Sequence, residues 1–134
     1  MLRQSMNAHA FISLEDVMKP IDPEMQRCIE ECLNCYQSCL GGASRHCLEA
    51  GGPHLEPEHF RLMLACAEMC RTAAHFMLLG VPHHRHTCAD CASMCRQCAD
   101  SCDSLSDMDD CAAMCRRCAD ACERMAGAST LPQD

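Results

Sequence analysis

The residues expected to face the interior of this protein recur at alternating steps of three and four, the spacing of one face of an α-helix. Four segments of about 20 residues carry this pattern; glycine and proline residues separate the first three, and a serine- and aspartate-rich link separates the third from the fourth. Val and Ile are scarce and no stretch sustains a two-residue alternation, so strands are not expected. With short links between the helices, the sequence predicts an all-α fold, an antiparallel up-down-up-down four-helix bundle.

Capping and helix-breaking residues set the expected boundaries. Asp22 caps the first helix, with Pro23 in its first turn, and Gly80 stops the second helix. Ser106 and Asp109 form a capping-box-like start for the fourth helix. The helices are expected at about 23–40 with a bent extension to 50, at 57–79, at 82–105 and at 109–127. The chain is thus divided into a short N-terminal helical arm (1–21), the bundle (22–127) and a disordered tail (128–134).

The stripe that faces the bundle axis holds cysteine where a helical bundle usually holds leucine. The chain has 16 Cys and 11 Met but no Trp, one Tyr and three Phe. Fifteen cysteines keep the helical spacing, whereas Cys47 lies one residue off it. The fifteen are Cys28, Cys32, Cys35 and Cys39 in the first helix, Cys66 and Cys70 in the second, Cys88, Cys91, Cys95, Cys98 and Cys102 in the third, and Cys111, Cys115, Cys118 and Cys122 in the fourth.

Several ordinary roles of cysteine fit this pattern poorly. Cysteine is small, so fifteen of them would leave a core below the packing density of native proteins. Disulfides between cysteines of one helix conflict with disulfide geometry. A catalytic thiol needs one cysteine distinguished by a polarising partner. Since no cysteine stands out from its neighbours, we do not expect an enzyme, and metal binding is the leading interpretation.

Charge and hydropathy argue against two classes of binding partner, nucleic acids and membranes. The formal net charge of −8 disfavours nucleic acid, whose phosphates would be repelled. No apolar stretch reaches the roughly 20 residues of a membrane span, and the first residues lack the apolar run of a signal peptide. We therefore expect a cytoplasmic protein with reduced thiols, bound to neither membrane nor nucleic acid.

The chemistry of the thiols favours Cu(I). Soft thiolates select Cu(I), and one Cu⁺ that replaces one thiol proton leaves the interior neutral. A Cys₄ zinc site instead leaves two net negative charges, which is costly when sites are stacked along a dry axis. Seven Cys-x-x-x-Cys pairs place two sulfurs on the same face of a helix. Two alternatives stay open, a zinc-binding structural or regulatory bundle and a thiol redox reservoir.

The helical register extends beyond the cysteines to other metal ligands at both ends. In the first helix it reaches Gly42 and His46, and in the second it reaches His59. All sixteen cysteines, Cys47 included, together with His46 and His59, are the candidate ligands, the two histidines at an entrance for copper. Beside these histidines we expect Met63 and Met108, and at the opposite end Met77, His83, His84, His86 and Met125.

The chain resembles the bacterial cysteine-rich four-helix-bundle copper storage proteins, and in particular their cytosolic branch. The resemblance covers about residues 22–126 and rests on Cys-x3-Cys-x2-Cys-x3-Cys runs at 28–39, 91–102 and 111–122, with Cys66 and Cys70 between them. It implies high-capacity Cu(I) storage and buffering in the bundle core, with multiple ions loaded from one open end. It also implies a homotetramer of bundles, with copper donor or acceptor proteins as partners.

Overall fold

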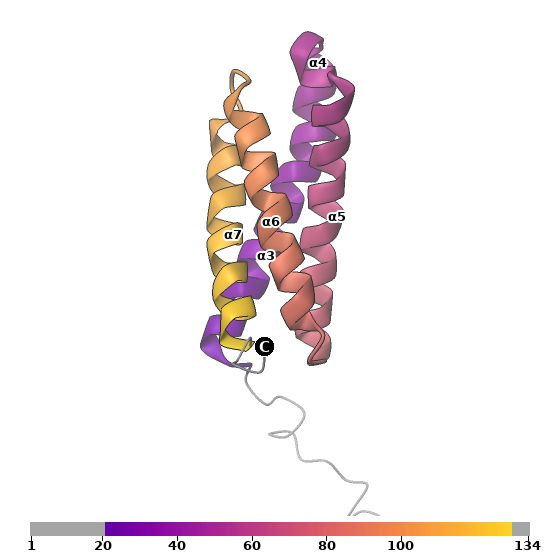
Figure 1. Ribbon diagram of the computed structural model, residues 1–134. Coiled ribbons are helices and arrows are strands. Elements are labelled where there is room, and N and C mark those ends of the chain that lie inside the picture. The colour runs from indigo at the N-terminus through magenta and orange to yellow at the C-terminus, as the bar shows by residue number, and fades with distance from the viewer. Residues whose placement is uncertain (1–20, 130–134) are drawn as a thin grey trace, which may run out of the picture.

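The computed structural model describes residues 21–129 and places four long helices side by side in an antiparallel bundle (Figure 1). Helix α3 (Pro23–Gly41) packs against α5 (Pro57–Leu79) and α7 (Asp109–Ser129), and α6 (His84–Asp103) packs against the same two helices. No residue in the described part of the chain lies in a strand. The predicted all-α, up-down-up-down bundle is confirmed. The arm predicted at 1–21 and the tail predicted at 128–134 lie almost wholly outside the described residues.

The start of α3 and the end of α5 form as their sequences predict. The Asp22 carboxylate accepts hydrogen bonds from the backbone N–H groups of Glu24 at 3.1 Å and Met25 at 3.2 Å. Gly80 follows α5 in the left-handed conformation with φ of 78°, which favours glycine.

The last two helices differ from the prediction at their ends. Helix α6 begins at His84 rather than at residue 82, because residues 81–83 form a turn in which the His84 N–H donates to the Val81 carbonyl. It ends at Asp103, and α7 continues to Ser129 beyond the predicted end at 127. These changes leave the inward positions of both helices unaltered.

The first helix continues through its glycine pair, Gly41 and Gly42, and its turns become wider there. Gly42–Cys47 form a π-helix, in which backbone hydrogen bonds span five residues instead of four. The wider turn adds one residue, so the inward stripe passes through Ala43 and Cys47, which are fully buried. The prediction that Cys47 lies off the stripe is therefore wrong, as is the prediction that the stripe passes through Gly42 and His46.

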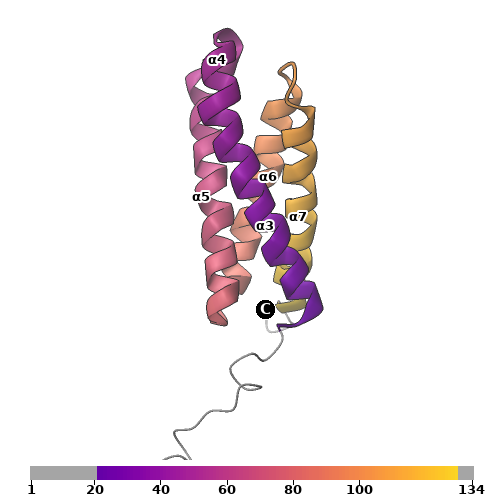
Figure 2. The same ribbon diagram turned by 180° about the vertical axis from the view of Figure 1, so that it is seen from behind.

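Two short elements connect this π-helix to the second long helix. They are α4 (Leu48–Ala50) and a 3₁₀ turn, η2 (Gly52–Leu55). Seen from behind, α3 lies between α5 and α7, and α4 stands at the same end as the α6–α7 link (Figure 2). The two linkers at this end of the bundle are therefore neighbours.

The two similar sequences 91–102 and 111–122 lie on neighbouring antiparallel helices. Each contributes one arginine that pairs with two carboxylates of the other helix at equivalent positions. The pairs are Arg96 with Asp120 and Glu123, and Arg116 with Asp100 and Asp103, at 2.6–3.1 Å. All are on the exposed side, where an ion pair contributes about 1 kcal/mol or less. The repeat thus aligns the two helices with their cysteines facing inward.

Candidate metal centre

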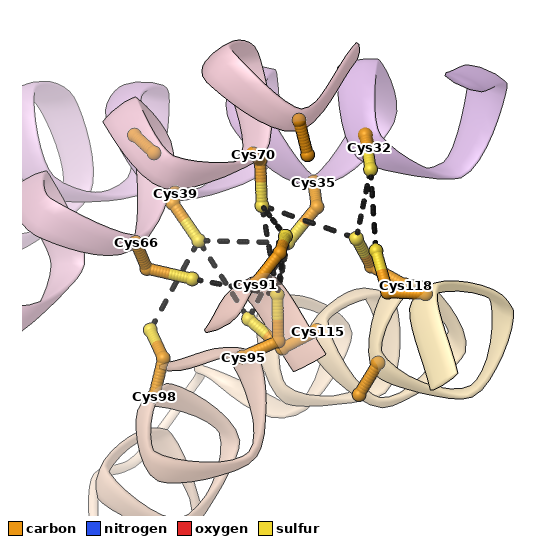
Figure 3. Close-up of a cluster of buried hydrophobic side chains, with 14 of the residues drawn as sticks. Cys32, Cys35, Cys39, Cys66, Cys70, Cys91, Cys95, Cys98, Cys115 and Cys118 are labelled. Atoms are coloured by element: carbon orange, nitrogen blue, oxygen red, sulfur yellow. Dashed lines mark hydrogen bonds between the residues drawn. The ribbon is translucent and has the colours of Figure 1, made fainter. Parts of the chain in front are cut away.

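All sixteen cysteines are buried, and none forms a disulfide. Their side chains meet between the helices, as Figure 3 shows for one part of the core. Neighbouring sulfurs lie 3.5–4.0 Å apart, with 3.5 Å between Cys70 and Cys95 and 3.6 Å between Cys39 and Cys115. The predicted inward placement of the fifteen seam cysteines is confirmed, and Cys47 joins them.

Twelve of the cysteines form four clusters within which every pair of sulfurs lies within 4.8 Å. Three cysteines belong to two clusters each: Cys35, Cys118 and Cys122. In order along the bundle, the clusters are Cys28/Cys88/Cys122, Cys32/Cys91/Cys118/Cys122, Cys35/Cys70/Cys95/Cys118 and Cys35/Cys39/Cys66/Cys115. The clusters therefore form a continuous column rather than four separate sites.

The sulfur separations suit ions bound between them. A metal–sulfur bond is about 2.3 Å long, so two sulfurs that share one ion lie about 3.8–4.6 Å apart. The separations of 3.5–4.0 Å between neighbouring sulfurs reach the lower part of this range. Small side-chain rotations would therefore be enough to bind an ion at each cluster.

The four remaining thiols lie toward the end of the bundle that carries α4. They are Cys47, Cys98, Cys102 and Cys111. Cys98 and Cys102 each donate a hydrogen bond to the Met63 sulfur at 3.6 Å. Met63 is fully buried, and its methyl group would lie 3.2 Å from a Cβ at position 42, which is glycine. A thioether thus extends the column of thiols at this end.

We call the group of His46, Cys47, His54 and His59 the histidine end. The Cys47 sulfur lies 3.8 Å from Nε2 of His59, and Nδ1 of the same ring lies 2.7 Å from the Ser101 hydroxyl. Because the hydroxyl holds Nδ1, Nε2 is the nitrogen that faces the thiol and can bind a metal.

The protonation of this pair also suits metal binding. Burial lowers the pKa of His59, and the nearby His54 adds to the effect, so the ring is neutral at pH 7. Burial raises the pKa of the Cys47 thiol, because a thiolate would lose its hydration. The metal-free pair is therefore uncharged, and a metal ion would displace the thiol proton.

His54 is a residue of this end that the sequence pattern does not reveal. It is 7% exposed, and its Nε2 donates a hydrogen bond to the Ser106 carbonyl at 3.0 Å. Its ring meets that of His46 edge to face, with centroids 5.1 Å apart. His54 lies in a linker, where no helical period points inward, and only its place after the glycine pair at 51–52 hints at a structured turn.

The opposite end holds the other predicted histidines, but they lie apart from the thiol clusters. His83 and His86 are exposed, with ring centroids 5.1 Å apart, and Nδ1 of His84 donates to the Val81 carbonyl at 2.8 Å. Met77 and Met125 are buried. No histidine of the described residues belongs to the four sulfur clusters.

A family comparison decides the identity of this cysteine column. The sequence profile of the copper storage protein family matches residues 21–127, which span all four helices. The chain belongs to the copper storage protein family. The resemblance that the cysteine runs indicate is thus confirmed over the whole bundle.

Solved structures of similar proteins share this fold. A protein from Nitrosospira multiformis is 47% identical, with a TM-score of 0.79 over 80% of this chain and 98% of its own. The Cu(I)-bound copper storage protein BsCsp3 is 32% identical, with a TM-score of 0.71 over 77% of this chain and 98% of its own. A relative is also found by sequence. The uncharacterized cysteine-rich protein YhjQ of Bacillus subtilis is 34% identical over 77 residues, which are 58% of this chain and 70% of that protein.

Proposed function

We propose that this copper storage protein holds many Cu(I) ions along its axis, bound by the thiolates of its sixteen cysteines. The observation that carries the proposal is the sharing of Cys35, Cys118 and Cys122 between clusters. Cu(I) is satisfied by two or three sulfurs, and one thiolate can bridge two ions. Adjacent ions can therefore share ligands, and the column can fill without gaps.

The charge of the column disfavours zinc as the stored ion. A zinc site with four thiolates of its own keeps two net negative charges. Even with shared thiolates, four zinc ions on the twelve clustered cysteines would leave four net negative charges in a dry interior. Replacement of thiol protons by Cu⁺ adds no charge.

Anaerobic titration of the reduced protein with Cu(I) against a competing chelator is expected to saturate near one ion per cysteine, about 16 per chain. A parallel titration with Zn(II) is the control and should saturate at a few ions. Saturation of Cu(I) at one to four ions would contradict storage and favour a zinc-stabilised bundle. Protein that is isolated with many disulfides and takes up little Cu(I) after reduction would favour a redox reservoir.

The column is suited to storage rather than catalysis, because its clustered thiols contact one another rather than an activating base. Cys47 does meet His59, but burial raises the pKa of this thiol and so disfavours the reactive thiolate. The histidine end is the proposed entrance, with His46 and His59 as the first protein ligands. Imidazole is a harder ligand than thiolate, so an ion received there would pass readily to the sulfurs deeper in the bundle. Copper donor or acceptor proteins would dock at this end.

The proposed assembly is a homotetramer, and the outer side of α5 supports it. Leu64, Leu78 and Leu79 are 39%, 57% and 60% exposed. Among the described helices, α5 is the one long and apolar enough to cross a membrane, but its other side holds Cys66 and Cys70 in the core. An apolar face of this kind suits contact with further copies.

Analytical ultracentrifugation tests this assembly. We expect a mass about four times the 14.8 kDa of one chain. A Leu78→Glu/Leu79→Glu variant should dissociate into smaller species, because a charged group would be buried in the contact. A wild-type monomer at micromolar concentration would contradict the proposal.

The proposed location is the cytoplasm. Sixteen unbridged cysteines support it, because thiols persist in a reducing compartment. Recovery of the protein from an oxidising compartment after cell fractionation would contradict it.

A further inference from the structure

A hydrogen bond joins the two linkers that lie over the histidine end. His54 is in η2, between α4 and α5, and Ser106 is in the link between α6 and α7. The two residues are 52 positions apart in the chain, yet Nε2 of His54 lies 3.0 Å from the Ser106 carbonyl oxygen. The bond therefore ties the first helix pair to the second across the end of the bundle.

His54 also contacts the group through which copper is proposed to enter. Its ring lies edge to face against His46, with centroids 5.1 Å apart at 84°. Nε2 of His46 is buried and has no hydrogen-bond partner in the described residues. The next residue is Cys47, whose sulfur lies 3.8 Å from His59. His54 thus lies beside a short series of ligands that leads to the sulfur column.

The linker that carries His54 has a ready hinge. Gly51 and Gly52 precede it with φ of 67° and 55°, in the region that favours glycine. The 3₁₀ turn η2 is only four residues long (Gly52–Leu55), and Glu56 alone separates it from α5, which begins at Pro57. Loss of one hydrogen bond would let this short turn move while the four helices stay packed.

We infer that His54 is a latch that closes the histidine end, and that release of its bond to the Ser106 carbonyl opens access to His46 and Cys47. The latch controls the rate of access and leaves the number of thiols unchanged. The inference rests on the proposed function only in taking Cu(I) as the species admitted. The closure itself can be tested without metal.

The test uses the reduced, metal-free full chain and the thiol reagent 5,5′-dithiobis(2-nitrobenzoate). In this reaction a cysteine thiolate attacks the reagent disulfide, which forms a mixed disulfide and releases one thionitrobenzoate. In His54→Ala we expect one thiol to react about tenfold faster than in the wild type, because one buried hydrogen bond no longer opposes opening. Initial Cu(I) uptake should accelerate similarly, with the final amount of bound copper unchanged.

Three variants separate a latch from general loosening. His54→Phe keeps a ring against His46 but has no donor, so it should show the same fast phase. Addition of Cys47→Ala to His54→Ala should abolish that phase. His75→Ala, at an exposed position of α5, is the matched control and should react like the wild type.

Other results would overturn the inference. An unchanged thiol rate in a folded His54→Ala protein would place the entrance elsewhere, such as the surface cavity of about 360 Å³ between α5 and α6 that His59 lines. A fast phase that persists without Cys47, or that equals the change in His75→Ala, would indicate loosening of the whole bundle. Failure of Cu(I) to bind at all would refute storage and would leave the thiol result intact.

Discussion

Saturation with Cu(I) is expected to raise the thermal unfolding midpoint of this protein by more than about 30 °C. A ligand that binds the folded state about a thousand times more tightly than the unfolded chain adds about 4 kcal/mol per site at saturation. Four sulfur clusters with this preference, which comes from holding the thiols together, would add about 16 kcal/mol, which exceeds the whole stability of a typical domain, about 5–15 kcal/mol. One kcal/mol shifts the midpoint by a few °C in a chain of this size.

The metal-free protein is expected to have only modest stability, because its core side chains are small. Its core consists mainly of Cys and Ala, with Met63 and Met77 as the largest fully buried side chains. Scanning calorimetry of the reduced protein, with and without Cu(I) under anaerobic conditions, measures the shift. Removal of copper by a strong chelator should restore the lower midpoint, and a rise below about 5 °C would show that the column binds copper weakly.

Periodicity was enough to predict which cysteines face inward, because the rise and turn of an α-helix fix the direction of each side chain. Beyond residue 41 the chain leaves this uniform period. The local sequence is compatible with an inward stripe through Gly42 and His46 or through Ala43 and Cys47. The π-helix selects the second by adding a residue where Gly42 allows close approach of Met63. That contact joins two successive helices, so no pattern within the first helix could show it.

The histidine end was predictable only in part for a related reason. His59 lies on the helical stripe of α5, and the sequence places it there correctly. His54 lies in a linker, and its partner Ser106 lies in another linker, so the contact depends on the assembled bundle. Cys47 reaches His59 only because of the wider π-helical turn, which a uniform helical period cannot represent.

Removal of a shared thiol is expected to lower copper capacity more than removal of an unshared one. Cys35 belongs to two clusters, and its sulfur lies 3.7 Å from that of Cys115 and 4.0 Å from that of Cys95. In Cys35→Ala two neighbouring ions would each lose a ligand. In competition with a chelator that removes no copper from the wild type, we therefore expect this variant to hold about two fewer Cu(I) ions per chain.

Cys47→Ala is the matched control, because it makes the same substitution at an equally buried site outside all four clusters. It should lose at most about one ion, since its sulfur contacts His59 rather than a shared cluster. Equal losses in the two variants, measured by anaerobic competition titration of folded proteins, would show that each thiol holds its ion independently. A larger loss in Cys35→Ala would show that thiolates bridge ions, which is what allows a bundle of this width to store a continuous column of copper.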